Sequence, residues 1–380
     1  MLPRTLFTAE HDAFRQTVRR FFAEEVVPQH ARWEQQGFVD RSMWLRAGAL
    51  GLLCLTIPEQ YGGAGADRLY CAVVIDEQAY AGASAMSFLH YTEVFANYIL
   101  KYGTEAQRLH WLPKLASGRM VSTVAMTEPG TGSDLQAIAT RATKEGADYV
   151  VDGSKTFISY GCTADIFLVA LKTASGPGGQ AEISLMLVEA DRPGFSRGKP
   201  LKKIGLNGQD VCELSFSGVR VPQHNLLGPT EGRGFSMLLQ ELTWERLMIA
   251  ISAVASAHTA LVGTLTHTRD RKAFGQSVAS FQNTAFKLAE LKAEIAIGQV
   301  FVDRCIEAFM SGNLPEEASA SAKYWASDLL CKTVDQCLQL HGGYGYMLDY
   351  PIARAFVDAR VSKIYTGTNE IMKALIARNL

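Results

Sequence analysis

The sequence predicts an α+β protein of several domains, with a helical domain at each end and an antiparallel, barrel-like β domain between them. Three observations lead to this fold class. The chain has 380 residues, more than a single hydrophobic core usually serves. Helical spacing of apolar residues fills residues 1–118 and returns over residues 227–380, whereas residues 119–226 consist of short β-branched segments. Because helices and strands come in separate runs, a doubly wound parallel sheet is not expected.

The first domain is expected to contain five helices. Apolar residues recur at spacings of three and four, and turn-rich pieces such as PEQYGGAGADR separate the segments. The N-terminus has acidic residues and the amphipathic spacing of Leu6, Phe14, Val18 and Phe21, so we expect the first helix of the fold there and not a signal peptide. The segments lie near residues 8–26, 40–53, 68–82, 86–102 and 104–115.

The middle domain is expected to be a compact antiparallel β structure. Its segments are short, rich in β-branched residues and partly alternating, and the Gly/Pro/Ser loop TASGPGGQ separates two of them. The expected strands are MVSTVAM, DYVVDGSKTFIS, DIFLVALKT, EISLMLVEA and CELSFSGVRVP.

The third domain is expected to be a bundle of helices. Its longest apolar stretch, residues 247–262, contains serines and His258 and is shorter than the roughly 18 apolar residues of a membrane span. We therefore expect an interior helix there and no membrane span. The helical segments lie near residues 232–268, 280–311, 315–340, 349–357 and 367–378.

Charge and cysteine content exclude several classes of function. The 37 basic and 38 acidic residues give a net charge of −1, without the basic patch of a nucleic-acid binder. Small molecules or further copies of the chain are the expected partners. Seven scattered cysteines without a C-x-x-C pair predict neither a disulfide framework nor a zinc site, so we expect a reduced, cytoplasmic protein without a metal.

Three glycine clusters, YGGAG, PGTGSD and HGGYGYM, do not fit the G-x-G-x-x-G pattern of a nicotinamide site. TEPGTGSD follows a predicted strand and offers main-chain N–H groups in a tight turn, which suits either an anion site or ordinary turn chemistry. Likewise, RDRKAFGQ places cations at a helix end, where they suit the helix dipole or grip a phosphate. The sequence leaves both alternatives open.

Glu245, in ELTWERLMIA, is an acid in a helix that is otherwise becoming apolar. Its neighbours at three and four positions are Glu241, Leu242, Met248 and Ile249. A carboxylate in such surroundings either pairs with a cation or has a raised pKa. The sequence therefore predicts a structural ion pair or a base in a dry pocket.

Five segments together resemble the acyl-CoA dehydrogenase family of flavoproteins. They are AMTEPGTGSDL, KTFIS, RDRKAFGQSVASFQ, LQLHGGYGYMLDYPIAR and DARVSKIYTGTNEIMKALIAR, in the family's order, and the resemblance as a whole extends from the first helix to the last residues. The last third is especially similar to the long-chain and isovaleryl-type members. The resemblance implies a helical, a β and a second helical domain, one FAD per subunit, and a homotetramer built from dimers.

The resemblance also implies the cofactor site. Met126, Thr127, Gly132 and Ser133 would lie along the flavin, and Phe157 and Ser159 would cover its face where the family usually carries W-I-T. An aromatic ring and a hydroxyl remain despite that departure. Residues reaching the flavin mainly from a neighbouring subunit would be Arg271, Phe274, Gln282, Gln339 and Gly343, and Thr368 and Glu370 in the tail would also contact FAD.

The catalytic base needs a separate argument, because many members place a glutamate in IYEGT where this chain has IYTGT. Thr366 cannot serve as the base at neutral pH, but its main-chain N–H would still bind the thioester oxygen. Long-chain and isovaleryl-type members carry the acid in an E-R pair on another helix, which here is Glu245 followed by Arg246. Glu245 would take the α-proton while a hydride leaves for the flavin, with a pKa of about 6–7.

Arg246 points to another side of that helix and is expected to be a structural or nearby charge, although it also belongs to the expected substrate contacts. Those contacts are Ser133, Arg246, Tyr365 and Gly367. The expected reaction is dehydrogenation of an acyl-CoA to the trans-2-enoyl thioester, with an electron-transfer flavoprotein as oxidant. An oxygen-using oxidase or monooxygenase and a non-catalytic scaffold are the alternatives, and the acyl chain length and the carrier are not fixed by the sequence.

Overall fold

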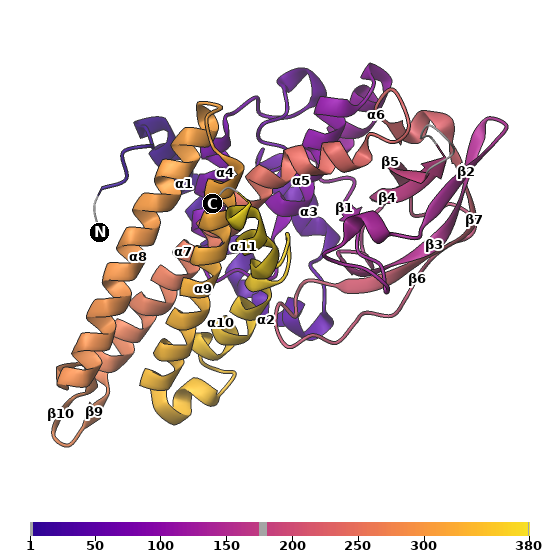
Figure 1. The fold of residues 1–380 in the computed structure, drawn as a ribbon. Helices are drawn as coiled ribbons and strands as arrows, with labels where there is room; N and C mark the ends of the chain where they lie inside the picture. The colour runs from indigo at the N-terminus through magenta and orange to yellow at the C-terminus, as the bar shows by residue number, and fades with distance from the viewer. Residues whose placement is uncertain (1–2, 175–180, 379) are drawn as a thin grey trace.

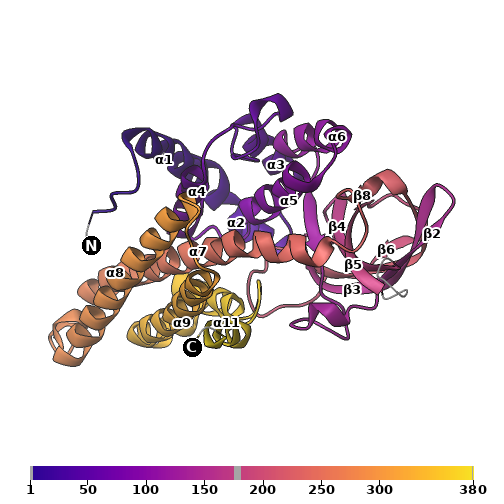
Figure 2. The ribbon, with the colours of Figure 1, turned by 45° about the horizontal axis from the view of Figure 1, so that its top comes forward.

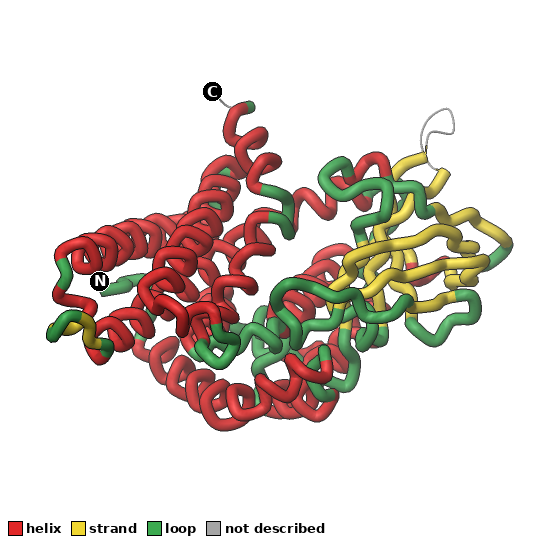
Figure 3. The backbone as a smooth tube through the Cα atoms, turned by 90° about the horizontal axis from the view of Figure 1, so that it is seen from below, coloured by secondary structure: helices red, strands yellow, loops and turns green. Residues whose placement is uncertain are grey.

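The structure, a computed structural model, describes residues 3–174, 181–378 and 380. Helices occupy one end of the molecule and strands the other (Figure 1), and the separation is clearest when secondary structure is coloured (Figure 3). Along the chain the order is helices, strands, helices, which confirms the predicted fold class. The predicted loop at residues 175–180 lies outside the described residues.

The N-terminal helices begin close to the predicted positions, but the first one continues ten residues further. A π-helical turn at Phe22–Val26 joins α1 to α2, which ends at the left-handed Gly37. The wider turn shifts the apolar face, so the 3.6-residue pattern is interrupted although the helix is not. The helices are α1 (Ala9–Phe21), α2 (Val27–Gln36), α3 (Arg41–Ala49), α4 (Arg68–Tyr80), α5 (Phe88–Tyr102) and α6 (Glu105–Ala116).

The middle domain is one eight-stranded sheet in the order β6-β7-β3-β2-β4-β5-β8, with β1 also paired to β4. Most neighbours are antiparallel, as predicted, but β1 and β2 both run parallel to β4. The strands are β1 (Ser122–Ala125), β2 (Arg141–Glu145), β3 (Asp148–Ser159), β4 (Ile166–Ala174), β5 (Ala181–Glu189), β6 (Phe195–Arg197), β7 (Val211–Pro222) and β8 (Leu226–Leu227). A separate hairpin pairs β9 (Lys272–Ala273) with β10 (Gln276–Ser277).

The C-terminal domain is built around α7, a helix of 37 residues that reaches from the β domain to the opposite tip of the molecule (Figure 2). By length and composition α7 could cross a membrane, but 67% of its most apolar stretch is buried within the protein. It packs against α4, α5, α8 and α9 and is a core helix. The helices are α7 (Gly234–Asp270), α8 (Gln282–Met310), α9 (Glu316–His341), α10 (Pro351–Ala359) and α11 (Asn369–Ala377).

Candidate active site

A cavity of about 610 Å³ lies where the three domains meet. Its walls come from α4 and α5, from α7, from the ends of β1 and β3, and from the segment between α10 and α11. Both polar and apolar side chains line it, which is typical of a site for a small molecule. Seven of the predicted site residues are on its wall: Met126, Thr127, Phe157, Ser159, Glu245, Tyr365 and Thr366.

Glu245 is half-buried on α7 and faces this cavity. Burial raises its pKa to about 7, and the carboxylate of Glu241 one turn earlier adds to the rise. The hydroxyl of Tyr98, 3.5 Å from Glu245 Oε1, and the cation of Arg246 oppose the shift. A carboxylate with this pKa is both substantially ionised and basic at neutral pH, as a general base requires.

The nearby cations pair with other acids. Lys101 Nζ lies 2.8 Å from Glu241 Oε1, and the Tyr102 hydroxyl donates to the same oxygen at 3.1 Å. Among the described residues no cation lies within 4 Å of Glu245. The alternative of a structural ion pair for Glu245 was therefore wrong, and its carboxylate remains available to a molecule in the cavity.

Arg246 does not line the cavity, so the expectation that it contacts the substrate was wrong. Its side chain is buried, and its guanidinium lies 3.2 Å from Glu316 at the start of α9. Successive residues of a helix point about 100° apart, so Arg246 leaves α7 on a different side from Glu245. It stabilises the packing of α7 on α9 and is not part of the cavity wall.

The loop that carries Tyr365 and Thr366 is held in an unusual conformation. Thr366 has φ +54° and Gly367 has φ +86°, both in the left-handed region. Gly367 is beside the cavity wall and not on it, and a Cβ there would lie 2.8 Å from Met372. Thr368 caps α11 by accepting a hydrogen bond from the Ile371 N–H at 3.3 Å, and Glu370 is exposed in the first turn of that helix.

On the opposite wall, a buried ion pair fixes the segment after β1. Lys155 Nζ donates to Glu128 at 2.8 Å and to the carbonyl of Met126 at 2.9 Å, and Lys155 is fully buried. Burial alone would raise the pKa of Glu128, but hydrogen bonds from Lys155 and from the 139–140 segment outweigh it and lower that pKa. The main chain that presents Met126 and Thr127 is therefore rigidly placed.

Phe157 is on a bulge of β3, where the register with β7 shifts between Lys155 and Ile158. Its φ is +57°, and 68% of its side chain is exposed on the cavity side of the sheet. A large ring held outward by a strained backbone offers a flat face for stacking. Two residues later, Ser159 lines the cavity, and its carbonyl accepts a hydrogen bond from Thr123.

The other predicted cofactor residues are outside the cavity wall, on the turn after β1 and around the outer end of α7. Gly132 and Ser133 are exposed on the turn after β1, outside the cavity wall. Arg271, Gln339 and Gly343 lie together in a second hollow beside the outer end of α7, which shares His267 and His341 with the cavity. Close by along the chain, Phe274 is 97% exposed on the β9–β10 hairpin, and Gln282 is exposed at the start of α8.

Several residues of the site were not predicted. Tyr98 comes from α5, far from Glu245 in sequence, so only the fold brings the two together. Lys155 and Lys323 are fully buried lysines that each bind a main-chain carbonyl of a cavity loop. A single lysine at an inward position, as in DGSKTFIS and SAKYWASD, is the one sequence signal that could have indicated them.

Three family models match the chain in succession. The acyl-CoA dehydrogenase N-terminal domain matches residues 8–119, the middle domain residues 123–219 and the C-terminal domain residues 232–380. These matches, in the order of the three domains of the fold, define an oxidoreductase, and the chain belongs to the acyl-CoA dehydrogenase family.

Within that family the chain is similar to long-chain specific members. It is 47% identical to the mitochondrial long-chain specific acyl-CoA dehydrogenase of Sus scrofa, over 99% of this chain and 88% of that protein. An acyl-CoA dehydrogenase structure from Geobacillus kaustophilus is 43% identical, with a TM-score of 0.96 and 99% of both chains covered. A Bacillus anthracis acyl-CoA dehydrogenase complexed with FAD has a TM-score of 0.93 at 30% identity, over 98% of this chain and 67% of that one.

Proposed function

We propose that this protein is an FAD-dependent acyl-CoA dehydrogenase that converts an acyl-CoA to the trans-2-enoyl thioester, with Glu245 as its base. The observation that carries the proposal is the carboxylate of Glu245, which faces the cavity, has no cation within 4 Å in the part of the chain that the structure describes, and has a pKa raised to about 7. The tail position that supplies the acid in many relatives is occupied by Thr366 in the same cavity.

In this mechanism Glu245 takes the α-proton of the bound thioester. The negative charge that develops on the thioester oxygen would be stabilised by the main-chain N–H of Thr366. When bound, FAD would supply the redox chemistry of the reaction, as the acceptor of the β-hydrogen. A substrate bound in the cavity would displace bulk water from the carboxylate and so maintain its basicity.

The residues present fit FAD. The exposed ring of Phe157 offers a stacking face, and Ser159, Thr127 and Met126 lie beside it on the same wall. Arg271 in the second hollow provides a guanidinium suited to a pyrophosphate, and Gln339 and Gly343 lie with it. This hollow lies at the outer end of α7, away from the part of the cavity at Glu245. We propose that it binds the FAD of a neighbouring subunit.

A long acyl chain is the proposed substrate. From Glu245 the cavity follows α7 to His267, 22 residues further on, or about 33 Å of helix axis at 1.5 Å per residue. Its floor on α7 consists mostly of small side chains, Ser252, Ala253, Ser256, Ala260 and Gly263. The long-chain name of the Sus scrofa relative supports the same assignment. Steady-state rates on acyl-CoAs of about four to about sixteen carbons would test it, because each buried methylene contributes about 0.8 kcal/mol.

We also propose an electron-transfer flavoprotein as the oxidant. A chain 31% identical to this one belongs to a structure described as the electron transferring flavoprotein of Acidaminococcus fermentans. Reoxidation of the reduced enzyme by such a flavoprotein, compared with reoxidation by oxygen, would test this partner and the oxidase alternative together.

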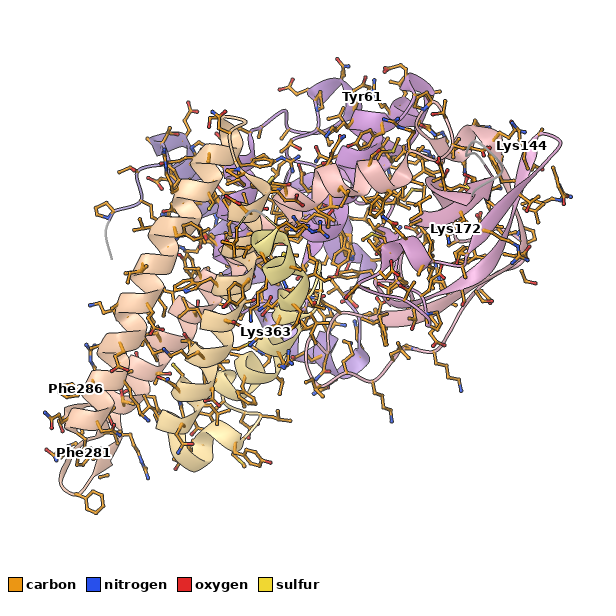
Figure 4. The ribbon with its side chains drawn as sticks, in the orientation of Figure 1. Tyr61, Lys144, Lys172, Phe281, Phe286 and Lys363 are labelled. Carbon is orange, nitrogen blue, oxygen red and sulfur yellow. The ribbon has the colours of Figure 1, made fainter. Side chains whose placement is uncertain are left out.

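We propose a homotetramer whose subunits meet through the outer face of α8. The exposed apolar side chains on this face are Phe286, Ile297, Val300 and Phe301. Their spacing places them along one side of the helix, with the exposed Glu290 between Phe286 and the other three, and exposed apolar side chains on one face favour an interface. Figure 4 shows Phe286, with Phe281, at the end of the molecule farthest from the sheet. Native mass determination would test the assembly.

All seven cysteines are free, which supports the proposed location in the reducing cytoplasm.

Glu245→Gln is the decisive variant. It should keep bound FAD but lose bleaching of the flavin by acyl-CoA by at least about a hundredfold, since it removes the base. Glu316→Gln, which alters the exposed partner of Arg246, is the matched control and should bleach normally. Near-normal turnover of the Glu245 variant would refute the base assignment.

A further inference from the structure

Lys323 is a fully buried lysine on α9 that the proposed reaction does not use. Its Nζ donates to the carbonyl of Gly367 at 2.7 Å and to Asn369 Oδ1 at 2.9 Å. Burying an ammonium group is costly unless its partners are well placed, so the position calls for a specific contact. Both acceptors lie at the start of the last helix, 44 and 46 residues further along the chain.

The cluster around Lys323 is completed by two further residues of α9. Ser327, one turn later and also fully buried, lies 3.0 Å from Asn369 Nδ2, and Asp328 accepts from the same amide at 3.1 Å. Asn369 is therefore held from two sides. With it, α9 fixes the beginning of α11 and the carbonyl that precedes it.

The loop held in this way forms part of the cavity wall. On its first side, the Tyr365 N–H donates to the carbonyl of Val361 at 3.1 Å. On its second side are the Lys323 contact and the Thr368 cap of α11. Between these anchors Thr366 and Gly367 adopt left-handed φ angles of +54° and +86°. Such a conformation of a threonine is strained and persists only where the surroundings impose it.

We propose that Lys323 is a positioning residue, which holds the carbonyl of Gly367 and so keeps the main-chain N–H of Thr366 directed at the thioester oxygen. This inference rests on the proposed function. A hydrogen bond at an oxyanion is effective only when its donor is already oriented, because reorientation during the reaction cancels the gain. Lys323 supplies that orientation from behind the loop without contact with the substrate.

The charge state of Lys323 suits this task. Burial lowers its pKa to about 8, while the carboxylates of Glu370 and Asp328 act in the opposite direction. Most of the amine is therefore protonated at neutral pH and donates to both acceptors. A protonated amine holds a carbonyl more strongly than a neutral donor does.

Lys323→Met tests the proposal, because methionine fills a similar volume and removes the donor. The readout is the infrared C=O stretch of a bound acyl-CoA analogue with ¹³C in the thioester carbonyl and sulfur in place of the β-carbon, so that no hydride can leave. In the wild type, hydrogen bonding should lower this frequency, and in Lys323→Met most of the lowering should be lost. We expect kcat with acyl-CoA to fall roughly tenfold to a hundredfold, with a smaller change in KM and unchanged FAD content.

Lys332→Met is the matched control, since Lys332 is on the same helix but is exposed and pairs with Glu294. It should retain the wild-type frequency and rate. If the Lys323→Met protein does not fold, Lys323→Gln keeps a polar group in the cluster, but its shorter side chain should not reach Gly367, and the same loss is expected.

A Lys323 variant that folds, with wild-type frequency and kcat, would overturn the inference. A wild-type protein that oxidises no acyl-CoA would instead overturn the proposed function, so the two failures are distinguishable.

Discussion

Glu241 and Glu245 lie one turn apart on α7. Of these two acids, only Glu241 has a cation within ion-pair distance among the described residues. Lys101 Nζ is 2.8 Å from Glu241, whereas the Tyr98 hydroxyl lies 3.5 Å from Glu245 Oε1. The negative charge of Glu241 is one cause of the raised pKa of Glu245. The two acids therefore have separate tasks, one to set the local potential and the other to face the substrate.

Glu241→Gln should extend activity to lower pH. Loss of the neighbouring charge lowers the pKa of Glu245, and the acidic limb of the kcat/KM profile should move down by roughly half a unit. Lys101→Met should move the same limb up, because Glu241 then loses its compensating cation. Profiles measured from about pH 5 to pH 9 would check both shifts. Movement of both variants in one direction would contradict the argument.

Glu245→Gln should stabilise the protein at high pH. The pKa of about 7 in the folded state is above the usual value of 4.5, so the fold favours the protonated acid. That contribution to the free energy of unfolding is complete below about pH 4.5 and is lost as pH rises through 7. At pH 8 the glutamine protein should be more stable by about 1 to 3 kcal/mol, and at pH 5 the difference should fall to roughly a quarter of that. Chemical denaturation at both pH values would check this, and an equal difference at both would contradict it.

Lys155→Met should destabilise the β domain. It leaves the buried carboxylate of Glu128 without its cation, which typically costs about 3–5 kcal/mol. Glu128→Gln in the same protein should recover part of the loss, because it removes the isolated charge. Released from Lys155, the Met126 carbonyl should shift and FAD content should fall. Denaturation midpoints of the single and double variants are the measurement. A single variant as stable as the wild type would show that the pair has no net effect.

Ser256→Leu should shorten the accepted acyl chain. Ser256 lines the cavity 11 residues after Glu245, on the same side of α7 and about 16 Å along its axis. A leucine there would displace the last few methylenes of a sixteen-carbon chain, each worth about 0.8 kcal/mol. We expect kcat/KM for long chains to fall by about tenfold or more, with little change for short ones. Ser256→Ala is the control and should keep the wild-type preference.

Much of the fold could be predicted because its signals are local. The long apolar helix around Glu245 and the strand segments follow from spacing, and the family resemblance, together with the absence of an acid at Thr366, led to Glu245 as the proposed base. By contrast, β2 was missed because four of its five residues are exposed and show no alternation. The π-helical turn at Phe22–Val26 likewise interrupts a pattern without ending the helix.

The geometry of the site could not be predicted, because it depends on contacts between distant segments. The left-handed conformation of Thr366 is imposed in part by Lys323 on another helix, and the placement of Met126 depends on Lys155 two strands away. A lone lysine in a sequence looks like a solvated side chain until the fold encloses it. The same applies to Arg246, whose partner Glu316 is on a different helix.

The length of α7 has a consequence for the proposed tetramer. One helix carries Glu245 about a third of the way along its length and is followed at its outer end by Arg271, the proposed clamp on another subunit's cofactor. A helix transmits displacement along its axis, so loading of one subunit would influence acid–base geometry in the next. In mixed assemblies with some cofactor-free subunits, we expect turnover for each remaining flavin to fall below that of the fully loaded enzyme.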